Sequence, residues 1–202
     1  MRPMSRHFLI LTLVVGLLGV TTLAGAGDIP KSLNDIELGG VVAKMKKQVK
    51  LRRPKPMKGA PWLYRLSIVP NAVYSGGYVL IGTCAAPGRV LRIKLYYRDG
   101  TLEGFRKISG ELLKQYGDPT EYKGEFDGHT MGNKWSFTDA NTKPISLILQ
   151  RTESEDPEVG YGNTIKLTNW GMLEAERACW QERSGTHAAT HACPVTQPAA
   201  CY

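Results

Sequence analysis

The chain has 202 residues, of which 42% are hydrophobic, and it carries a formal net charge of +8. This length suits one domain plus a tail rather than a multidomain assembly. The charge is unevenly placed: residues 44–58 are strongly basic and residues 153–158 are locally acidic. Such a polarised molecule can be steered toward an anionic surface.

The N-terminus has the pattern of a secretory signal peptide, assigned to residues 1–26. Arg2 and Arg6 precede the apolar run Phe8–Leu23, and a small-residue cleavage site follows at 24–26. We therefore expect a periplasmic or secreted protein that begins near Gly27. The alternative is a membrane anchor formed by an uncleaved Phe8–Leu23, but sixteen residues are fewer than the roughly 20 that span a bilayer.

Residues 27–61 form a basic N-terminal lead-in to the domain. Apolar residues at helical spacing predict a short basic helix over 41–50, which Pro54 and Pro56 would prevent from continuing. The residues with this spacing are Val41, Val42, Met45 and Val49.

Alternating apolar and polar residues then predict three strands, at 62–68, 78–84 and 89–97. Gly76-Gly77 and residues 85–88 are expected to form the turns between them. In the third strand the apolar side chains should face the core, whereas Arg92 and Lys94 should face water.

A helix is predicted next, with an apolar face from Phe105 to Tyr116 and a stop at Gly117. Residues 120–132 look like a polar connection. Three more strands follow around 135–137, 145–149 and 164–168. A final helix is expected over about 172–182, capped by Asn169.

These elements predict a single α+β domain over residues 62–183. Its antiparallel sheet would have about six strands, with two or three helices packed on one face. Residues 184–202 are rich in Ala, Thr, Pro and His, and we expect a flexible tail that contains Cys and His.

All four cysteines lie after the signal peptide, which in an exported chain favours two disulfides. Three pairings are possible, and we favour Cys84–Cys179 with Cys193–Cys201. The first would tie a central strand to the last helix and close a long loop. A redox-active pair is not expected, because the chain has no Cys-x-x-Cys motif.

A helix that ends in Tyr116-Gly117-Asp118-Pro119, followed by Trp135-Ser136-Phe137 and Ile145-Ser146-Leu147, resembles a pattern of exported bacterial proteins. Small outer-membrane-assembly lipoproteins and β-lactamase-inhibitor-like domains share it. Residues 75–179 are more similar to an uncharacterised exported proteobacterial α+β family. The resemblance implies a small non-catalytic module whose sheet meets another protein. The chain lacks the lipidation cysteine of the assembly lipoproteins.

Candidates for catalysis and metal binding are sparse. His187 and His191, with Cys193 nearby, have zinc-ligand spacing, but a solvated tail explains them better. His129 beside Asp127 could act as a general base, although the same residues suit a polar turn. Surface acids better explain the carboxylates that could serve a hydrolase, which are Glu111, Glu121, Glu125 and Asp127. No metal or cofactor is expected.

The basic segment is the best functional lead, although a solvated basic face is the simpler explanation of it. Its apolar residues Met45, Val49, Leu51 and Met57 would allow shallow contact with an anionic lipid surface, and an acidic polysaccharide is the other candidate partner. Its cations are Lys44, Lys46, Lys47, Lys50, Arg52, Arg53, Lys55 and Lys58.

Three aromatic residues, Trp135, Phe137 and Trp170, are expected to fill the core rather than to line a ligand groove. The sequence therefore predicts an exported, non-enzymatic binding or assembly module of the bacterial envelope. Its expected partner is an envelope protein and not a nucleic acid. The alternatives are an envelope hydrolase that uses His129 with a nearby carboxylate, or a small-ligand carrier.

Overall fold

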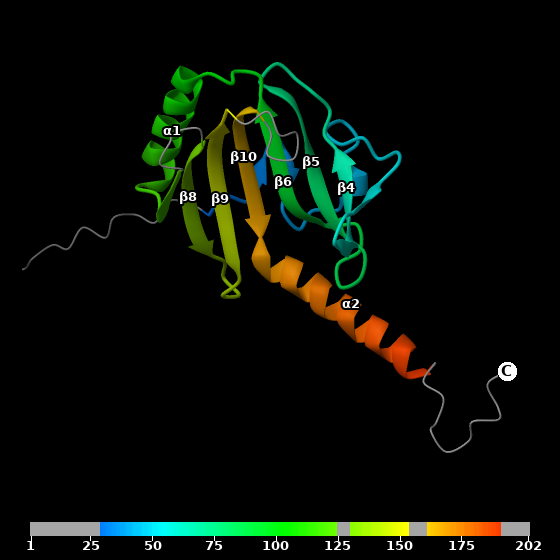
Figure 1. Ribbon diagram of the computed structural model, residues 1–202. Helices are drawn as coiled ribbons and strands as arrows, with labels where there is room; N and C mark the ends of the chain where they lie inside the picture. Colours follow the sequence, from blue (N-terminus) through cyan, green and yellow to red (C-terminus); the bar gives the residue numbers. More distant parts are fainter. Residues whose placement is uncertain (1–28, 125–129, 154–160, 191–202) are drawn as a thin grey trace, which may run out of the picture.

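The computed structural model describes residues 29–124, 130–153 and 161–190, with the side chains of Lys123 and of 186–190 left aside. Within these ranges the chain forms an eight-stranded sheet, a two-stranded hairpin and two α-helices (Figure 1). The sheet strands are β3 (Lys55–Met57), β4 (Ala60–Ser67), β5 (Tyr74–Gly82), β6 (Val90–Tyr97), β7 (Glu121–Gly124), β8 (Thr130–Thr138), β9 (Pro144–Thr152) and β10 (Gly162–Asn169).

The strand order is β3-β4-β5-β6-β10-β9-β8-β7, and every neighbouring pair is antiparallel. Two four-strand meanders thus join at β6 and β10, and a helix follows each: α1 (Leu102–Tyr116) and α2 (Trp170–Thr190). The predicted α+β class with an antiparallel sheet is confirmed, but the strand count of about six is wrong. The edge strands β3 and β7 were missed, because Pro56 interrupts one and polar residues dominate the other.

One face of the sheet carries the main hydrophobic core, and we call it the core face. Helix α1 packs on it through Phe105 and Leu112. Trp135 is buried there and donates a hydrogen bond from Nε1 to the Gly117 carbonyl at 2.9 Å, which fixes the end of the helix. The strand residues of the core face are Leu66, Ile68, Val79, Ile93, Leu95, Trp135, Ile145, Leu147, Leu149, Ile165 and Leu167.

The ends of α1 agree with the sequence. Thr101 caps the N-terminus by accepting a hydrogen bond from the Gly104 amide at 3.0 Å. Gly117 closes the C-terminus with φ of 75°, a conformation that glycine adopts without a steric penalty. On its buried side, Ser109 accepts a hydrogen bond from Asn133 Nδ2 at 2.7 Å, so this polar pair is satisfied inside the core.

Residues 29–51 cover the remainder of the core face. Strands β1 (Ser32–Leu33) and β2 (Ile36–Glu37) form a hairpin, and a 3-10 turn follows at Val42–Lys44. The helix predicted over 41–50 is therefore wrong. The stretch makes only isolated turns, such as the one closed by the Val49 amide on the Met45 carbonyl at 2.9 Å. Val49 then forms a β-bridge with Ile68, and the Lys50 amide donates to the Ser67 carbonyl, so the chain continues beside β4 instead of as a helix.

Helix α2 lies against the opposite face, at one end of the sheet, and runs away from it (Figure 1). Its Leu173 packs with Leu63, Leu80 and Leu91 in a second, smaller core. The expectation that the helices share one face is therefore wrong. A bulge between Leu80 and Ile81 shifts the register, and it lets Leu91 join this smaller core although Ile93 and Leu95 belong to the main one.

Two contacts fasten α2 to the β5–β6 loop. The predicted disulfide Cys84–Cys179 is present, with a Cα–Cα distance of 5.9 Å. The Glu176 carboxylate is fully buried and accepts hydrogen bonds from the backbone amides of Thr83 (3.1 Å), Cys84 (2.7 Å) and Ala86. A Cβ atom on Gly82 would lie 2.1 Å from Glu176 Oε1, so only glycine fits there.

Candidate anion-binding sheet face

The sheet face opposite the main core is rich in Lys and Arg. Cross-strand register places their positions in rows, because side chains that are directly opposite in an antiparallel pair share a face. One row contains Tyr78, Lys94, Lys166 and Lys134, and the adjacent row contains Arg65 and Arg92. We call this surface the basic face and define it by Lys55, Arg65, Arg92, Lys94, Lys134 and Lys166.

The eight strands of the sheet are unusually poor in acid. They carry eight Lys or Arg residues and a single carboxylate, Glu121, at the β7 edge. Glu121 forms an ion pair with Lys134 at 2.9 Å. The strands β3 to β6, together with β10 and β9, therefore bring no negative charge to the face they share.

At the centre of the face the cations are close enough to disturb one another. Lys94 and Lys166 are directly opposite on β6 and β10. Like charges at directly opposite positions destabilise the pairing of two strands. Partial burial lowers the pKa of Lys94, and the nearby charges of Arg65 and Arg92 lower it further. Burial likewise lowers the pKa of Arg92, whose Nε donates to Thr168 Oγ1 at 3.1 Å.

Aromatic rings contact three of these cations, one of which is Lys94, whose Nζ lies 5.5 Å from the centre of the Tyr96 ring. The Arg65 guanidinium carbon lies 4.2 Å from the centre of the Tyr78 ring, and Arg92 lies 5.4 Å from the Trp170 ring. Both are cation–π contacts, which hold a guanidinium in place while its N–H groups still point outward to other acceptors. Arg65 and Arg92 are thus held in place without a ligand.

A pocket opens where the edge strand β3 meets β4. Its volume is about 480 Å³, and we call it the tyrosine pocket. Lys55, Lys58 and Arg65 are exposed at it, whereas the rings of Tyr78 and Tyr96 are half-buried. Its lining residues are Lys55, Pro56, Met57, Lys58, Arg65, Tyr78 and Tyr96.

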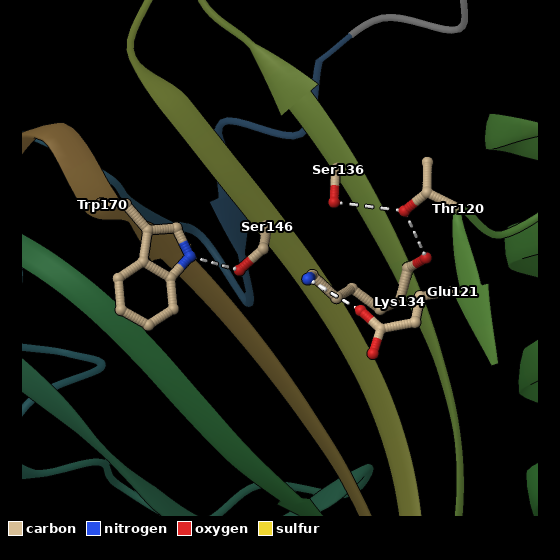
Figure 2. Close-up of polar contacts among 6 residues, drawn as sticks. All are labelled: Thr120, Glu121, Lys134, Ser136, Ser146 and Trp170. Atoms are coloured by element: carbon tan, nitrogen blue, oxygen red, sulfur yellow. Dashed lines mark hydrogen bonds and ion pairs between the residues drawn. The ribbon is translucent and has the colours of Figure 1, made fainter. Parts of the chain in front are cut away.

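The other end of the basic face is polar but nearly neutral (Figure 2). There Trp170 Nε1 donates to Ser146 Oγ at 2.9 Å, and the Thr120 hydroxyl bonds Ser136 Oγ and the Lys134 carbonyl. The ion pair of Glu121 with Lys134 lies beside them. These groups satisfy one another, so the excess positive charge is concentrated on the β3–β6 side.

The basic segment predicted from sequence is divided by the fold. All eight of its cations are exposed, but only Lys55 and Lys58 border the tyrosine pocket. Residues 44–50 belong to the segment that covers the core face. Met45 and Val49 are buried in the core, so the shallow amphipathic contact with lipid expected of them is wrong.

The candidates for catalysis are not brought together. Glu111 is exposed on α1 over the core face, whereas Glu121 pairs with Lys134 on the basic face. His129, Glu125 and Asp127 lie outside the described residues, as do His191, Cys193 and Cys201. His187 falls on α2, but its side chain is not described. Among the side chains that are described, no cluster of His, Cys, Asp and Glu could hold a metal ion.

The three aromatic candidates differ in placement. Trp135 is buried in the core as predicted, and half-buried Phe137 packs against it with Tyr116 at a ring distance of 5.5 Å. Trp170 is 39% exposed beside Arg92, so its assignment to the core is wrong.

Sequence reasoning missed Arg65, Arg92 and Lys94 as functional candidates. It placed them on the water-facing side of their strands, where charged residues need no further explanation. The available signal was the lack of compensating acid: the stretch from Lys55 to Tyr97 contains no Asp or Glu.

No protein-family model, curated protein or solved structure matches this chain. In the ranges that the structure covers, no helix is long and apolar enough to cross a membrane.

Proposed function

We propose that this protein is an exported, non-enzymatic binding module that holds an acidic polysaccharide of the cell envelope against its basic face. The observation that carries the proposal is the charge imbalance on this face, where six cations accompany a single strand carboxylate, that of Glu121. A sheet that serves only as a scaffold does not need this excess of positive charge on one face. A polyanion would complement it.

Two features favour a polysaccharide over an envelope protein or a lipid surface. Protein interfaces have an apolar core, and shallow lipid binding needs exposed apolar residues. Four large hydrophobic side chains are exposed in the described residues, and one of them, Trp170, contacts Arg92 of the basic face. Arg65 and Lys94, which lie against the rings of Tyr78 and Tyr96, instead suit a ligand that carries anionic groups.

Export is part of the same proposal. The N-terminal pattern predicts it, and the Cys84–Cys179 disulfide supports it, because such bonds persist in oxidising compartments. Within the envelope, a periplasmic location suits a module that binds a polymer there.

The test uses heparin as a polyanionic probe. What we call the basic-face variant combines Lys55→Gln and Arg65→Gln of the basic face with Lys58→Gln at the adjoining tyrosine pocket. The matched control, Lys44→Gln, Lys46→Gln and Lys47→Gln, removes the same charge from exposed sites outside this face. We expect the basic-face variant to weaken binding by roughly tenfold or more, and the control by less than about threefold. Affinity of the native protein should fall steeply as salt is raised.

Equal losses in the two variants would mean that net charge alone attracts the probe. Binding that ignores ionic strength would also contradict the proposal. A pull-down from an envelope extract, made with the same two variants, would then show whether an acidic protein is the preferred partner.

A further inference from the structure

The tyrosine pocket has a composition that a general polyelectrolyte surface does not need. Three cations converge on it: Lys55 is opposite Arg65 in the β3–β4 register, and Lys58 follows in the hairpin. Two phenol rings, Pro56 and Met57 form the rest of its wall. The pocket therefore combines strong anion recognition with an apolar surface.

Arg65 is prepared to recognise an oxyanion. Its guanidinium is held 4.2 Å from the centre of the Tyr78 ring, so little side-chain freedom is lost when it binds. A planar guanidinium can donate two parallel hydrogen bonds to a carboxylate, sulfate or phosphate group. The two exposed lysines add charge without demanding a particular geometry.

Tyr96 supplies a neutral donor. Burial and the neighbouring Tyr78 raise the pKa of its hydroxyl, and the charge and hydrogen bonding of Arg65 oppose that rise without reversing it. The phenol therefore stays protonated at neutral pH and can donate to a ligand oxygen. A hydroxyl-rich ring offers many such acceptors, whereas a bare anion uses its oxygen atoms on the cations.

The size of the pocket limits what enters it. A volume of about 480 Å³ lies within the range of small-molecule sites and is far too small for a helix or a folded surface. A pyranose ring has apolar C–H faces and a polar rim, and this matches a wall of tyrosine and methionine with cations at one side.

We propose that the tyrosine pocket is a subsite for a single oxyanion-bearing sugar residue, with the anion on Arg65 and the sugar ring against the tyrosines. This inference rests on the proposed function and names the unit of the polymer that is recognised. The shared chemistry is a pyranose with one carboxylate or sulfate group.

The test is a titration of the purified full-length mature protein with small probes, followed by calorimetry or NMR shifts. Glucuronate and glucose 6-sulfate carry both ring and charge. Acetate and inorganic sulfate carry charge alone, and glucose carries the ring alone. We expect at least one of the two charged sugars to bind roughly tenfold more tightly than glucose and than its own bare anion. The stronger of the two identifies the anion.

Two variants locate the site. Arg65→Gln should weaken binding of the charged sugar by roughly tenfold or more, because it removes a charge-assisted bidentate contact. Tyr96→Phe should weaken it by about threefold to tenfold, the effect of one lost hydrogen bond. As a control, Lys44→Gln at an exposed site outside the pocket should leave binding of the charged sugar within about twofold. Unchanged thermal unfolding confirms that each variant is folded.

The possible failures are distinct. If acetate or sulfate binds as tightly as the corresponding sugar, the pocket recognises only the charge, and the sugar assignment is overturned. If no small probe binds while heparin still requires the basic face, the subsite is overturned and the proposed function stands. If the basic-face variant leaves heparin binding unchanged, the proposed function itself fails.

Discussion

The two faces of the sheet are built from the same strands but differ in the side chains they carry and in their roles. On the core face, β6 contributes Ile93 and Leu95, which are fully buried. On the basic face the alternate positions of that strand hold Arg92, Lys94 and Tyr96, which are half-buried. One strand thus supplies stability with every second residue and charge with the others.

The core face is required for folding, whereas the charges of the basic face are not. Any protein with this topology needs an apolar core face, because burial of apolar area drives folding. Burial lowers the pKa of Arg92 and Lys94, and neighbouring cations lower that of Lys94 further, so their charged forms are less favourable in the folded protein than in water. Functional tests should therefore target positions where burial disfavours the charge and where neighbouring strands nevertheless carry the same charge.

The largest expected effect is on the contact that attaches α2. Replacing both residues of the disulfide, Cys84→Ser with Cys179→Ser, releases a loop with a sequence separation of 95. Chain entropy predicts that the free energy of unfolding falls by about 4.7 kcal/mol. Urea denaturation measures this loss.

Hydrogen exchange on the same variant sharpens the comparison of the faces. Amides of α2 should lose protection, whereas those of Ile93 and Leu95 should keep it in relative terms. Equal loss in both places would show that α2 and the core face unfold as one unit.

The core face is tested by Trp135→Ala. This change removes a side chain that is 1% exposed and the hydrogen bond to Gly117, so we expect a loss of about 4 kcal/mol in the free energy of unfolding. Arg65→Ala, on the basic face, should change stability by less than about 0.5 kcal/mol. Chemical denaturation of the two variants compares them, and a similar loss in both would contradict the division of roles.

Most of the fold could be predicted from the sequence because its signals are local. Alternation located β4, β6 and β9, and Asn169 was rightly expected to cap α2, accepting a hydrogen bond from the Met172 amide at 3.0 Å. The glycine pair 76–77 misled, because it forms a bulge inside β5 instead of a turn. Gly77 is required there, since a Cβ atom would lie 2.2 Å from the Lys94 carbonyl.

The candidate site could not be predicted in the same way. Arg65 and Tyr96 are 31 positions apart in the chain, and they approach each other only because β5 brings β4 and β6 into register. Glu176 was missed for the same reason: its partners at Thr83, Cys84 and Ala86 are at least 90 positions away. Long-range pairing of this kind leaves no local pattern.

A smaller effect is expected at Glu176 itself. In Glu176→Gln, one oxygen that accepts a backbone hydrogen bond is replaced by an amide donor, so an amide of the β5–β6 loop loses its partner. Hydrogen bonds to a charged group are the stronger class, and we expect the free energy of unfolding to fall by about 2 kcal/mol. Urea denaturation measures it with the disulfide intact, and Glu174→Gln, an exposed position on the same helix, is the control. A loss no larger than that of the control would show that the disulfide alone holds α2.

The smallest effect has the opposite sign and concerns Lys94. Its lowered pKa means that the native protein binds fewer protons than the unfolded chain between the folded value and about 10.5, so this residue's contribution to stability improves as pH rises through that alkaline window. Below the window the charge is retained at a cost. Lys94→Gln should therefore raise the free energy of unfolding at pH 7 by roughly 0.5 kcal/mol, the scale of one like-charge pair across two strands.

The same substitution should weaken heparin binding, because it removes a cation from the centre of the basic face. A gain in stability combined with a loss of affinity is the result that a purely structural sheet would not give. Thermal unfolding at pH 7 and pH 10 checks the first half, since the difference between the variant and the native protein should shrink at the higher pH. If Lys94→Gln destabilises the protein at both values, the lysine supports the fold, and the division between a stabilising face and a binding face does not hold at this position.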